Sequence, residues 1–392
     1  MSKLEELIQQ YCPDGVEYKP LGDYLSYEQP TKYLVANTKY DDSFLTPVLT
    51  AGQSFILGYT NEKVGIFQAS KDVPVIIFDD FTTSFHWVDF SFKVKSSAMK
   101  MLRPIDENKA LFRYLYYCMK NIPYVPGDHT RQWIGTYSQF EIPVPPLPVQ
   151  EEIVRILDNF TELQAELQAE LQKRKLQYNY YLDNLLSFEG RTDVRWMMLK
   201  EACEFVKDGT HGSYKNVDSG YPLLSAKDIN NGVLTIPTNS RKISKTDFDD
   251  IYKNYKIKSG DVLITIVGSV GRTAIVRDFI DVAFQRSVGI LRPNNKVTSS
   301  FLFYILQTTQ QQKQLMSKIS KSAQGGVYLG ELNKIIIPIP PLEEQQRIVS
   351  ILDRFDRLTT DLSQGLPAEI EKRRQQYEYY RDTLLTFKRK AA

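Results

Sequence analysis

The chain has 392 residues, more than one hydrophobic core usually organises, so we expect at least two domains. Its 42% hydrophobic and 24% charged residues are ordinary for a folded protein, and no apolar run approaches the roughly eighteen residues of a membrane span. The first residues lack the apolar stretch of a signal peptide. Cys12, Cys118 and Cys203 fit neither a disulfide framework nor a metal-binding spacing. We therefore expect a cytoplasmic protein that does not enter a membrane.

The net charge of +2 is distributed unevenly along the chain. Residues 1–150 carry −3, residues 151–190 carry −4, residues 191–341 carry +8 and residues 342–392 carry +1. A strongly basic segment suits a surface that faces DNA phosphates. Charge therefore favours nucleic-acid binding by the third segment and gives no such support for the first.

The first segment, residues 1–149, has the pattern of a mixed α/β domain. The apolar run Val75–Phe78 predicts a buried strand, and Gly, Asn, Asp and Pro punctuate the sequence around it. One clear helical stretch spans Ala110–Lys120. The pair Pro145-Pro146 ends this domain and prepares the start of a helix.

Residues 150–190 are predicted to form one long helix, because apolar residues recur at helical spacing from Ile153 to Phe188. Unbroken, this helix is about 58 Å long and needs a partner helix along its apolar stripe. Three successive units of the type Thr/Ala-Glu-Leu-Gln fill Thr161–Gln172, and each adds about 6 Å of rise. These units suggest an adjustable spacer, although a solvated helix with one leucine row explains them equally well.

The third segment, residues 191–341, repeats the character of the first. A strand is predicted within Asp261–Val267 and a helix over Ser299–Lys318. Leu102-Arg103-Pro104 matches Leu291-Arg292-Pro293, which favours a shared scaffold role for the two arginines. The middles of the two segments differ. Two copies of one scaffold with different inserts suggest two readers of different targets.

The last segment, residues 342–392, repeats the long helix. The offset between the copies grows from 195 to 199, so the second copy carries four extra residues near Leu362–Gly365. Gly365 and Pro367 are expected to break or kink this helix. An antiparallel coiled coil between the two copies would bury both apolar stripes. The matched stretches are Ile142–Phe160 with Ile337–Phe355, identical at 12 of 19 positions, and Arg174–Phe188 with Arg373–Phe387, identical at 9 of 15.

The order of variable domain, repeated helix, variable domain and repeated helix resembles the specificity subunit of type I restriction–modification enzymes across nearly the whole chain. The duplicated pattern IPxPPL…Q…IV.ILD.F…QY.YY.D.LL.F carries this resemblance, supported by Tyr11–Tyr18 and Tyr255–Arg272. The resemblance implies an α+β fold with two globular mixed α/β target-recognition domains, separated by two long helices in an antiparallel coiled coil. It also implies that each domain reads one half of a split double-stranded DNA site. Two modification (methyltransferase) subunits and motor–nuclease restriction subunits are the partners implied.

No motif for catalysis, metal or cofactor emerges. Gly268–Thr273 lacks the lysine and the spacing of a P-loop, and both Pro-Pro pairs lead into leucine rather than the aromatic residue of an amino-methyltransferase motif. The histidines have no metal-ligand partners in sequence. Asp79-Asp80 mimics a nuclease carboxylate pair, but a strand-end loop explains it better. We expect a chain that is not an enzyme on its own and binds neither metal nor cofactor.

Candidate DNA contacts lie on polar loops between predicted strands, where side chains can reach base edges. Arg and Lys suit guanine, while Gln and Asn suit adenine, although a solvated loop explains each candidate as well. Trp133, next to one loop, is assigned to the core ahead of DNA. The candidates in the first domain are Thr82, Thr83, Ser84, His86, His129, Arg131 and Gln132. The candidates in the second domain are Lys207, Thr210, His211, Ser213, Lys227, Ser269, Arg272, Gln285, Arg286 and Gln324.

The tyrosine clusters near Tyr180 and Tyr379 suggest base stacking, but their helical spacing favours packing within the coiled coil or against a partner. Two other functions stay open. A coiled-coil DNA scaffold without sequence specificity explains the helices but not two divergent domains. A fused nuclease or methyltransferase needs a catalytic centre that the motifs do not supply.

Overall fold

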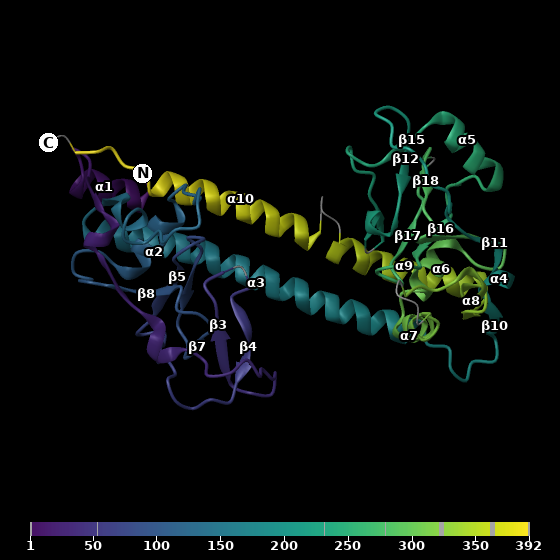
Figure 1. Cartoon of the computed structure of the whole chain (residues 1–392), viewed down its shortest axis with the longest axis horizontal. Coiled ribbons are helices and arrows are strands. Elements are labelled where there is room, and N and C mark those ends of the chain that lie inside the picture. Colours follow the sequence, from purple (N-terminus) through teal and green to yellow (C-terminus); the bar gives the residue numbers. More distant parts are fainter. Residues whose placement is uncertain are drawn as a thin grey trace. The chain divides into compact units, whose positions relative to one another are not determined.

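The computed structural model describes residues 2–52, 54–230, 232–278, 280–320, 325–360 and 365–390 (Figure 1). The chain divides into two compact units, unit 1 with residues 1–166 and 370–392 and unit 2 with residues 167–369. Both units mix helices with sheets, as the predicted α+β class requires. Within the described ranges, no helix combines the length and the apolarity that crossing a bilayer demands.

The described part of unit 1 contains three sheets. Their strand orders are β2-β8-β5-β6, β4-β3-β7 and β1-β9. The predicted strand at Val75–Phe78 is confirmed as the buried part of β5. The strands are β1 (Glu17–Pro20), β2 (Leu25–Glu28), β3 (Thr46–Leu49), β4 (Ile56–Thr60), β5 (Val75–Asp79), β6 (Phe85–Val88), β7 (Lys93–Val94), β8 (Met99–Pro104) and β9 (Glu141–Val144).

The helices of unit 1 pack around a core that runs from these sheets into the repeated helices. The predicted helix at Ala110–Lys120 is confirmed as α2 (Phe112–Lys120). Within unit 1, α10 runs antiparallel beside the first half of α3, and the ring of Phe160 stacks on that of Tyr380 at 5.2 Å (Figure 1). The helical elements are α1 (Lys3–Tyr11), η1 (Leu21–Asp23), η2 (Pro30–Tyr33), η3 (Tyr137–Gln139), α3 (Leu147–Leu185) and α10 (Leu366–Leu384).

The described part of unit 2 repeats this topology. The sheets β11-β19-β16-β17, β15-β12-β18 and β10-β20 correspond to those of unit 1, and a small sheet β13-β14 is added. The strands are β10 (Arg195–Met198), β11 (Cys203–Asp208), β12 (Tyr221–Leu224), β13 (Ile229–Asn230), β14 (Val233–Leu234), β15 (Lys242–Ile243), β16 (Val262–Thr265), β17 (Thr273–Ile275), β18 (Ala283–Phe284), β19 (Val288–Pro293) and β20 (Ile336–Ile339).

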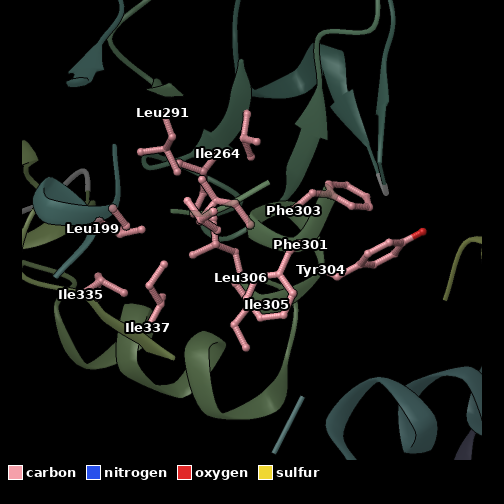
Figure 2. Close-up of a cluster of buried hydrophobic side chains, with 14 of the residues drawn as sticks. Leu199, Ile264, Leu291, Phe301, Phe303, Tyr304, Ile305, Leu306, Ile335 and Ile337 are labelled. Atoms are coloured by element: carbon pink, nitrogen blue, oxygen red, sulfur yellow. The ribbon is translucent and has the colours of Figure 1, made fainter. Parts of the chain in front are cut away.

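The predicted single helix over Ser299–Lys318 is wrong, because two helices occupy this stretch. The hydroxyl of Thr308 accepts the backbone N–H of Gln311 and starts a new helix there. Side chains of the first of these helices point into the core of unit 2 (Figure 2). The helical elements of unit 2 are α4 (Leu199–Ala202), η4 (Ala226–Asp228), α5 (Lys245–Asn254), α6 (Ser299–Ile305), α7 (Thr309–Ser317), α8 (Leu329–Leu332) and α9 (Leu342–Thr360).

The second copy of the long helix is described as α9, which ends at Thr360, and α10, which begins at Leu366. Pro367 is the second residue of α10, a position where the missing N–H is tolerated. Of the four extra residues predicted in this copy, Leu362–Gln364 lie outside the described residues.

One buried glutamine in each unit ties the start of the repeated helix to its domain. Gln150 accepts the N–H of Leu111 at 2.9 Å, and Gln345 accepts the N–H of Thr298 at 2.9 Å. Each amide also donates to the carbonyl of the first proline in the preceding Pro-Pro pair, at 2.7 and 2.9 Å. Both side chains are fully buried. The two copies of the repeat therefore use the same buried hydrogen bonds.

The packing predicted for the tyrosine clusters is present in both units. Tyr181 stacks on Phe355 at 5.1 Å in unit 2, the counterpart of the Tyr380 and Phe160 contact in unit 1. Tyr180 stays 66% exposed and is available to a partner. These residues line the helices, so we assign them no role in base stacking.

Candidate nucleic-acid interface

In unit 1 the chain turns tightly between β5 and β6, where three of the candidates lie. A carboxylate oxygen of Asp79 accepts the backbone N–H groups of Phe81 and Thr82, each at 2.9 Å. The hydroxyls of Thr82 and Ser84 are 2.7 Å apart. Thr83 has a φ of +58° and a buried side chain. The turn thus presents hydroxyl groups on a backbone fixed by Asp79.

A second loop, before β4, supports this turn. The Ser84 hydroxyl donates to the carbonyl of Ala51 at 2.7 Å, and Nε2 of His86 lies 2.9 Å from the carbonyl of Gly52. The ring of Phe55 stacks on His86 at 4.4 Å. Phe55, with a φ of +39°, and Thr83 are the only non-glycine residues with positive φ among those the structure describes. Strained backbone of this kind concentrates at functional sites.

A third loop, Asp128–Trp133, joins the same end of β5. The backbone N–H of Gln132 donates to the carbonyl of Asp80 at 2.8 Å. The ring of His129 stacks on Phe81 at 4.6 Å. The structure therefore brings the candidates Thr82–Ser84, His86, His129 and Arg131 to one region, where His129 and Arg131 are exposed.

Gln132 and Trp133 face inward, each 2% exposed. The amide oxygen of Gln132 accepts the Tyr124 hydroxyl at 2.7 Å, and its nitrogen donates to Asp128 at 3.1 Å. Hydrogen bonds to the Asp128 carboxyl hold its pKa below the usual range. The Thr130 hydroxyl makes the larger contribution and the Gln132 amide a smaller one. Trp133 belongs to the core, which confirms its preferred assignment. The Gln132 amide is engaged in hydrogen bonds within its own part of unit 1. A DNA contact by Gln132 stays a prediction.

In unit 2 the loop after β11 is paired with the turn between β18 and β19. Thr210 donates its N–H to the carbonyl of Phe284 at 2.7 Å and accepts the N–H of Arg286 at 3.0 Å. A Cβ on Gly209 would lie 2.2 Å from that Phe284 carbonyl oxygen, so the loop can approach only with glycine there. This pairing brings the candidates Thr210, His211, Gln285 and Arg286 together.

A cavity of about 360 Å³ lies beside this loop. Asp208, His211, Arg286 and Tyr328 contribute to its lining. Nε2 of His211 is 2.7 Å from a carboxylate oxygen of Asp208. The cavity therefore offers hydrogen-bond donors and acceptors of the kinds that base edges and phosphates need.

The other candidates of unit 2 form a second group or stand alone. The Arg272 guanidinium donates to the side-chain oxygen of Asn230 at 2.6 Å, and the carbonyl of Lys227 accepts from the same amide at 3.4 Å. Ser269 lies in the exposed turn before Arg272 and accepts the Thr265 hydroxyl through its carbonyl.

Two of the described candidates, Lys207 and Ser213, belong to neither group. Lys207 donates to the carbonyl of Asn254 and points to the face of β11 opposite Asp208, because side chains alternate along a strand. Ser213 is exposed in the loop. Gln324 lies outside the described residues.

The sequence pattern places Asp80 in a strand-end loop but does not identify it as an anchor for a second loop; its buried carboxylate lies 3.5 Å from the ammonium of Lys100. The strand-end interpretation of Asp79-Asp80 is confirmed, because the Asp79 carboxylate accepts N–H groups of its own turn and the Asp80 carboxylate accepts the N–H of Trp133 in another loop. The sequence feature that could have pointed to Asp80 is a charged residue directly after a buried apolar strand. Among the described residues, no three His, Cys, Asp or Glu side chains gather in a way that would hold a metal.

The arginines before the matched prolines do have scaffold roles. Arg292 forms a buried ion pair with Asp261 at 2.8 Å and covers the ring of Phe205 at 4.2 Å. Arg103 covers the ring of Phe67 at 5.0 Å. Neither Arg103 nor Arg292 was a candidate for base contact. Both lie near the ends of equivalent strands, β8 and β19, and pack there on an aromatic ring.

The chain matches the family described as "Type I restriction modification DNA specificity domain" twice, over residues 13–174 and 193–372. It is 43% identical to the Type I restriction enzyme EcoR124I/EcoR124II specificity subunit of Escherichia coli, over 99% of this chain and 97% of that protein. A putative type I restriction enzyme specificity subunit from Haemophilus influenzae is 32% identical, with 86% of each chain covered.

A solved structure gives the same fold. The type I restriction–modification S subunit from M. genitalium superposes with a TM-score of 0.54 at 14% identity, covering 95% of this chain and 96% of that one. With two family matches and a full-length relative at 43% identity, the chain belongs to the specificity subunits of type I restriction–modification systems, which assemble with other subunits and bind DNA.

Proposed function

We propose that the recognition domains, residues 1–149 and 191–341, each read one half of a bipartite DNA site. One observation carries this proposal: two copies of one scaffold end in different polar loops, at equivalent strands β5 and β16. A shared scaffold supplies a common geometry, while the loops supply different donors and acceptors. The two halves of the site should therefore have unrelated sequences.

The helical segments 150–190 and 342–392 are proposed to set the gap between the half-sites and to dock two modification subunits. The exposed rings of Tyr180 and Tyr379, 66% and 68% exposed at equivalent positions, support docking of two like partners on the two copies. A specificity subunit is not an enzyme on its own, so methylation and cleavage belong to partners. Motor–nuclease subunits complete the restriction complex that we propose.

We propose that direct base contacts come from the exposed candidates gathered at the loops. In unit 1 these are Thr82, His129 and Arg131, and in unit 2 His211 and Arg286. Phosphate contacts position a protein on DNA, whereas base contacts carry the sequence information. Lys227 lies beside the second group and suits phosphate because of its point charge.

Competition binding tests this function. The subunit, assembled with its modification partner, is titrated with labelled target duplex against unlabelled random duplex at fixed salt. We expect the target to compete about a thousandfold or more better than random DNA, the lower end for specific DNA-binding proteins. Equal competition by both duplexes would support the non-specific scaffold instead.

A further inference from the structure

A buried carboxylate holds one of the candidate reading loops. Oδ1 of Asp80 accepts the backbone N–H of Trp133 at 2.9 Å, and the Asp80 carbonyl accepts that of Gln132 at 2.8 Å. The Asp80 side chain is almost fully buried beside the ammonium of Lys100, which also lies over the ring of Tyr27 at 4.3 Å. One residue thus holds two consecutive residues of Asp128–Trp133, here called the reading segment.

The equivalent place in unit 2 lacks these charges. Strand pairing aligns Ile76 with Leu102 in unit 1 and Val262 with Leu291 in unit 2, which makes Ile266 the counterpart of Asp80. By the same register Gly289 is the counterpart of Lys100. The backbone hydrogen bond is present in both units, since the Ile266 carbonyl accepts the N–H of Val327 at 2.8 Å. Only the side-chain bond is particular to unit 1.

The buried pair does not serve stability well. Taking two charges out of water costs several kcal/mol, and an apolar pair of similar volume is often as stable. Unit 2 shows that the scaffold forms without the ion pair, because Ile266 and a glycine, Gly289, occupy the equivalent positions. A directional role explains the pair better, since a carboxylate fixes the N–H that it accepts.

We propose that Asp80 is a positioning residue for DNA reading by unit 1. Its carboxylate fixes the Trp133 end of the reading segment and thereby the place of the exposed His129 and Arg131. The Lys100 ammonium, 3.5 Å away, supplies the opposite charge beside that carboxylate in the buried site. This role rests on the proposed function of unit 1 as a reader of one half-site.

Two double variants separate positioning from stability. Asp80→Leu with Lys100→Met removes both charges and the acceptor for the Trp133 N–H. Asp80→Asn with Lys100→Met removes both charges but keeps an oxygen acceptor. The control is Glu62→Gln with Lys93→Met, which neutralises another buried ion pair of unit 1, 2.8 Å long and separate from the reading segment. Each is assembled with the modification partner, and affinity is compared for duplexes altered in one half-site or the other.

The Leu/Met variant should fold, yet discriminate about tenfold less at one half-site only, because the buried N–H of Trp133 loses its acceptor and the reading segment is no longer fixed. The Asn/Met variant and the control should discriminate as the wild type does. Unchanged discrimination in the Leu/Met variant, equal losses at both half-sites, or an equal loss in the Asn/Met variant or the control would overturn the positioning role. A wild-type complex without sequence preference would instead contradict the proposed function itself.

Discussion

Units 1 and 2 are alike where their domains meet the repeated helices and unlike where β5 and β16 end. At the helices, Gln150 and Gln345 make the same buried hydrogen bonds, and Tyr117 and Tyr304 donate to equivalent aspartates at 2.5 and 2.6 Å. At the strand ends, the charged anchor Asp80 in unit 1 corresponds to the apolar residue Ile266 in unit 2. Under the proposed function, the shared contacts at the helices serve assembly with partners, and the different loops read different half-sites.

The largest expected effect comes from the element that both units share. Deleting Ala165–Gln168 removes about 6 Å from α3 and rotates its flanks by about 40°, so the leucine row survives. The preferred gap should shrink by about one to two base pairs at roughly 3.4 Å each, while both half-sites stay the same. Methylation at the original site should therefore be lost and appear at the shorter one.

Long-read sequencing of methylated DNA measures this gap. A deletion of only two residues is the control, because it turns the apolar stripe by roughly 200° and should abolish assembly. An unchanged gap after the four-residue deletion would show that the repeats of Thr161–Gln172 are ordinary solvated helix and not a spacer.

The second prediction tests whether the two units are equivalent at the helices. Gln150→Leu and Gln345→Leu each leave a buried N–H and a buried carbonyl without a partner, at about 1–3 kcal/mol per group. Each should lower the free energy of unfolding by about 3 kcal/mol or more, with faster hydrogen exchange in α2 or α6 respectively. Gln346→Leu, an exposed neighbour, should change stability by less than about 0.5 kcal/mol. Strongly unequal losses of stability in the two variants would show that Gln150 and Gln345 do not have equivalent roles.

Much of this architecture could be predicted because it repeats along the sequence. The helical periodicity, the strand at Val75–Phe78 and the packing of the tyrosine clusters along the repeated helices all follow from local patterns. The meeting of Asp80 with Trp133 did not, because the two residues are 53 positions apart and only the sheet brings their loops together. The side chain of Lys207 turned away from the cavity for a similar reason, since strand register decides its face.

The third prediction sharpens the difference at the loops. Arg286→Ala and Arg272→Ala should each cost about 1–3 kcal/mol of binding and relax one position in the half-site of unit 2, if they reach base edges. If the variants bind all sequences more weakly by the same factor, the two arginines contact phosphate instead. Arg277→Ala, an exposed arginine outside the candidate groups, is the matched control. Affinities for single-base variants of the target decide between these outcomes.

The smallest effect concerns an acid at the start of each repeated helix. Arg155 and Lys3 hold the pKa of Glu152 at about 2, and Arg347 and Arg191 hold that of Glu344 at about 2. Because both values are depressed from 4.5, this stabilisation is full above pH 4.5 and is lost as the pH falls towards 2. The basic partners are partly exposed, so each contribution is about 1 kcal/mol or less. Urea midpoints of Glu152→Gln and Glu344→Gln should therefore fall less steeply with acid than the wild type, and identical slopes would refute this.

Domain exchange tests the central claim most directly. Residues 192–336 are replaced by the matching segment of a related subunit, and methylated adenines are mapped genome-wide in cells that carry either version. We predict a bipartite motif in which one half changes, while the other half and the gap are retained. A change in both halves, or no dependence of the motif on this chain, would contradict the assignment of one half-site to each unit.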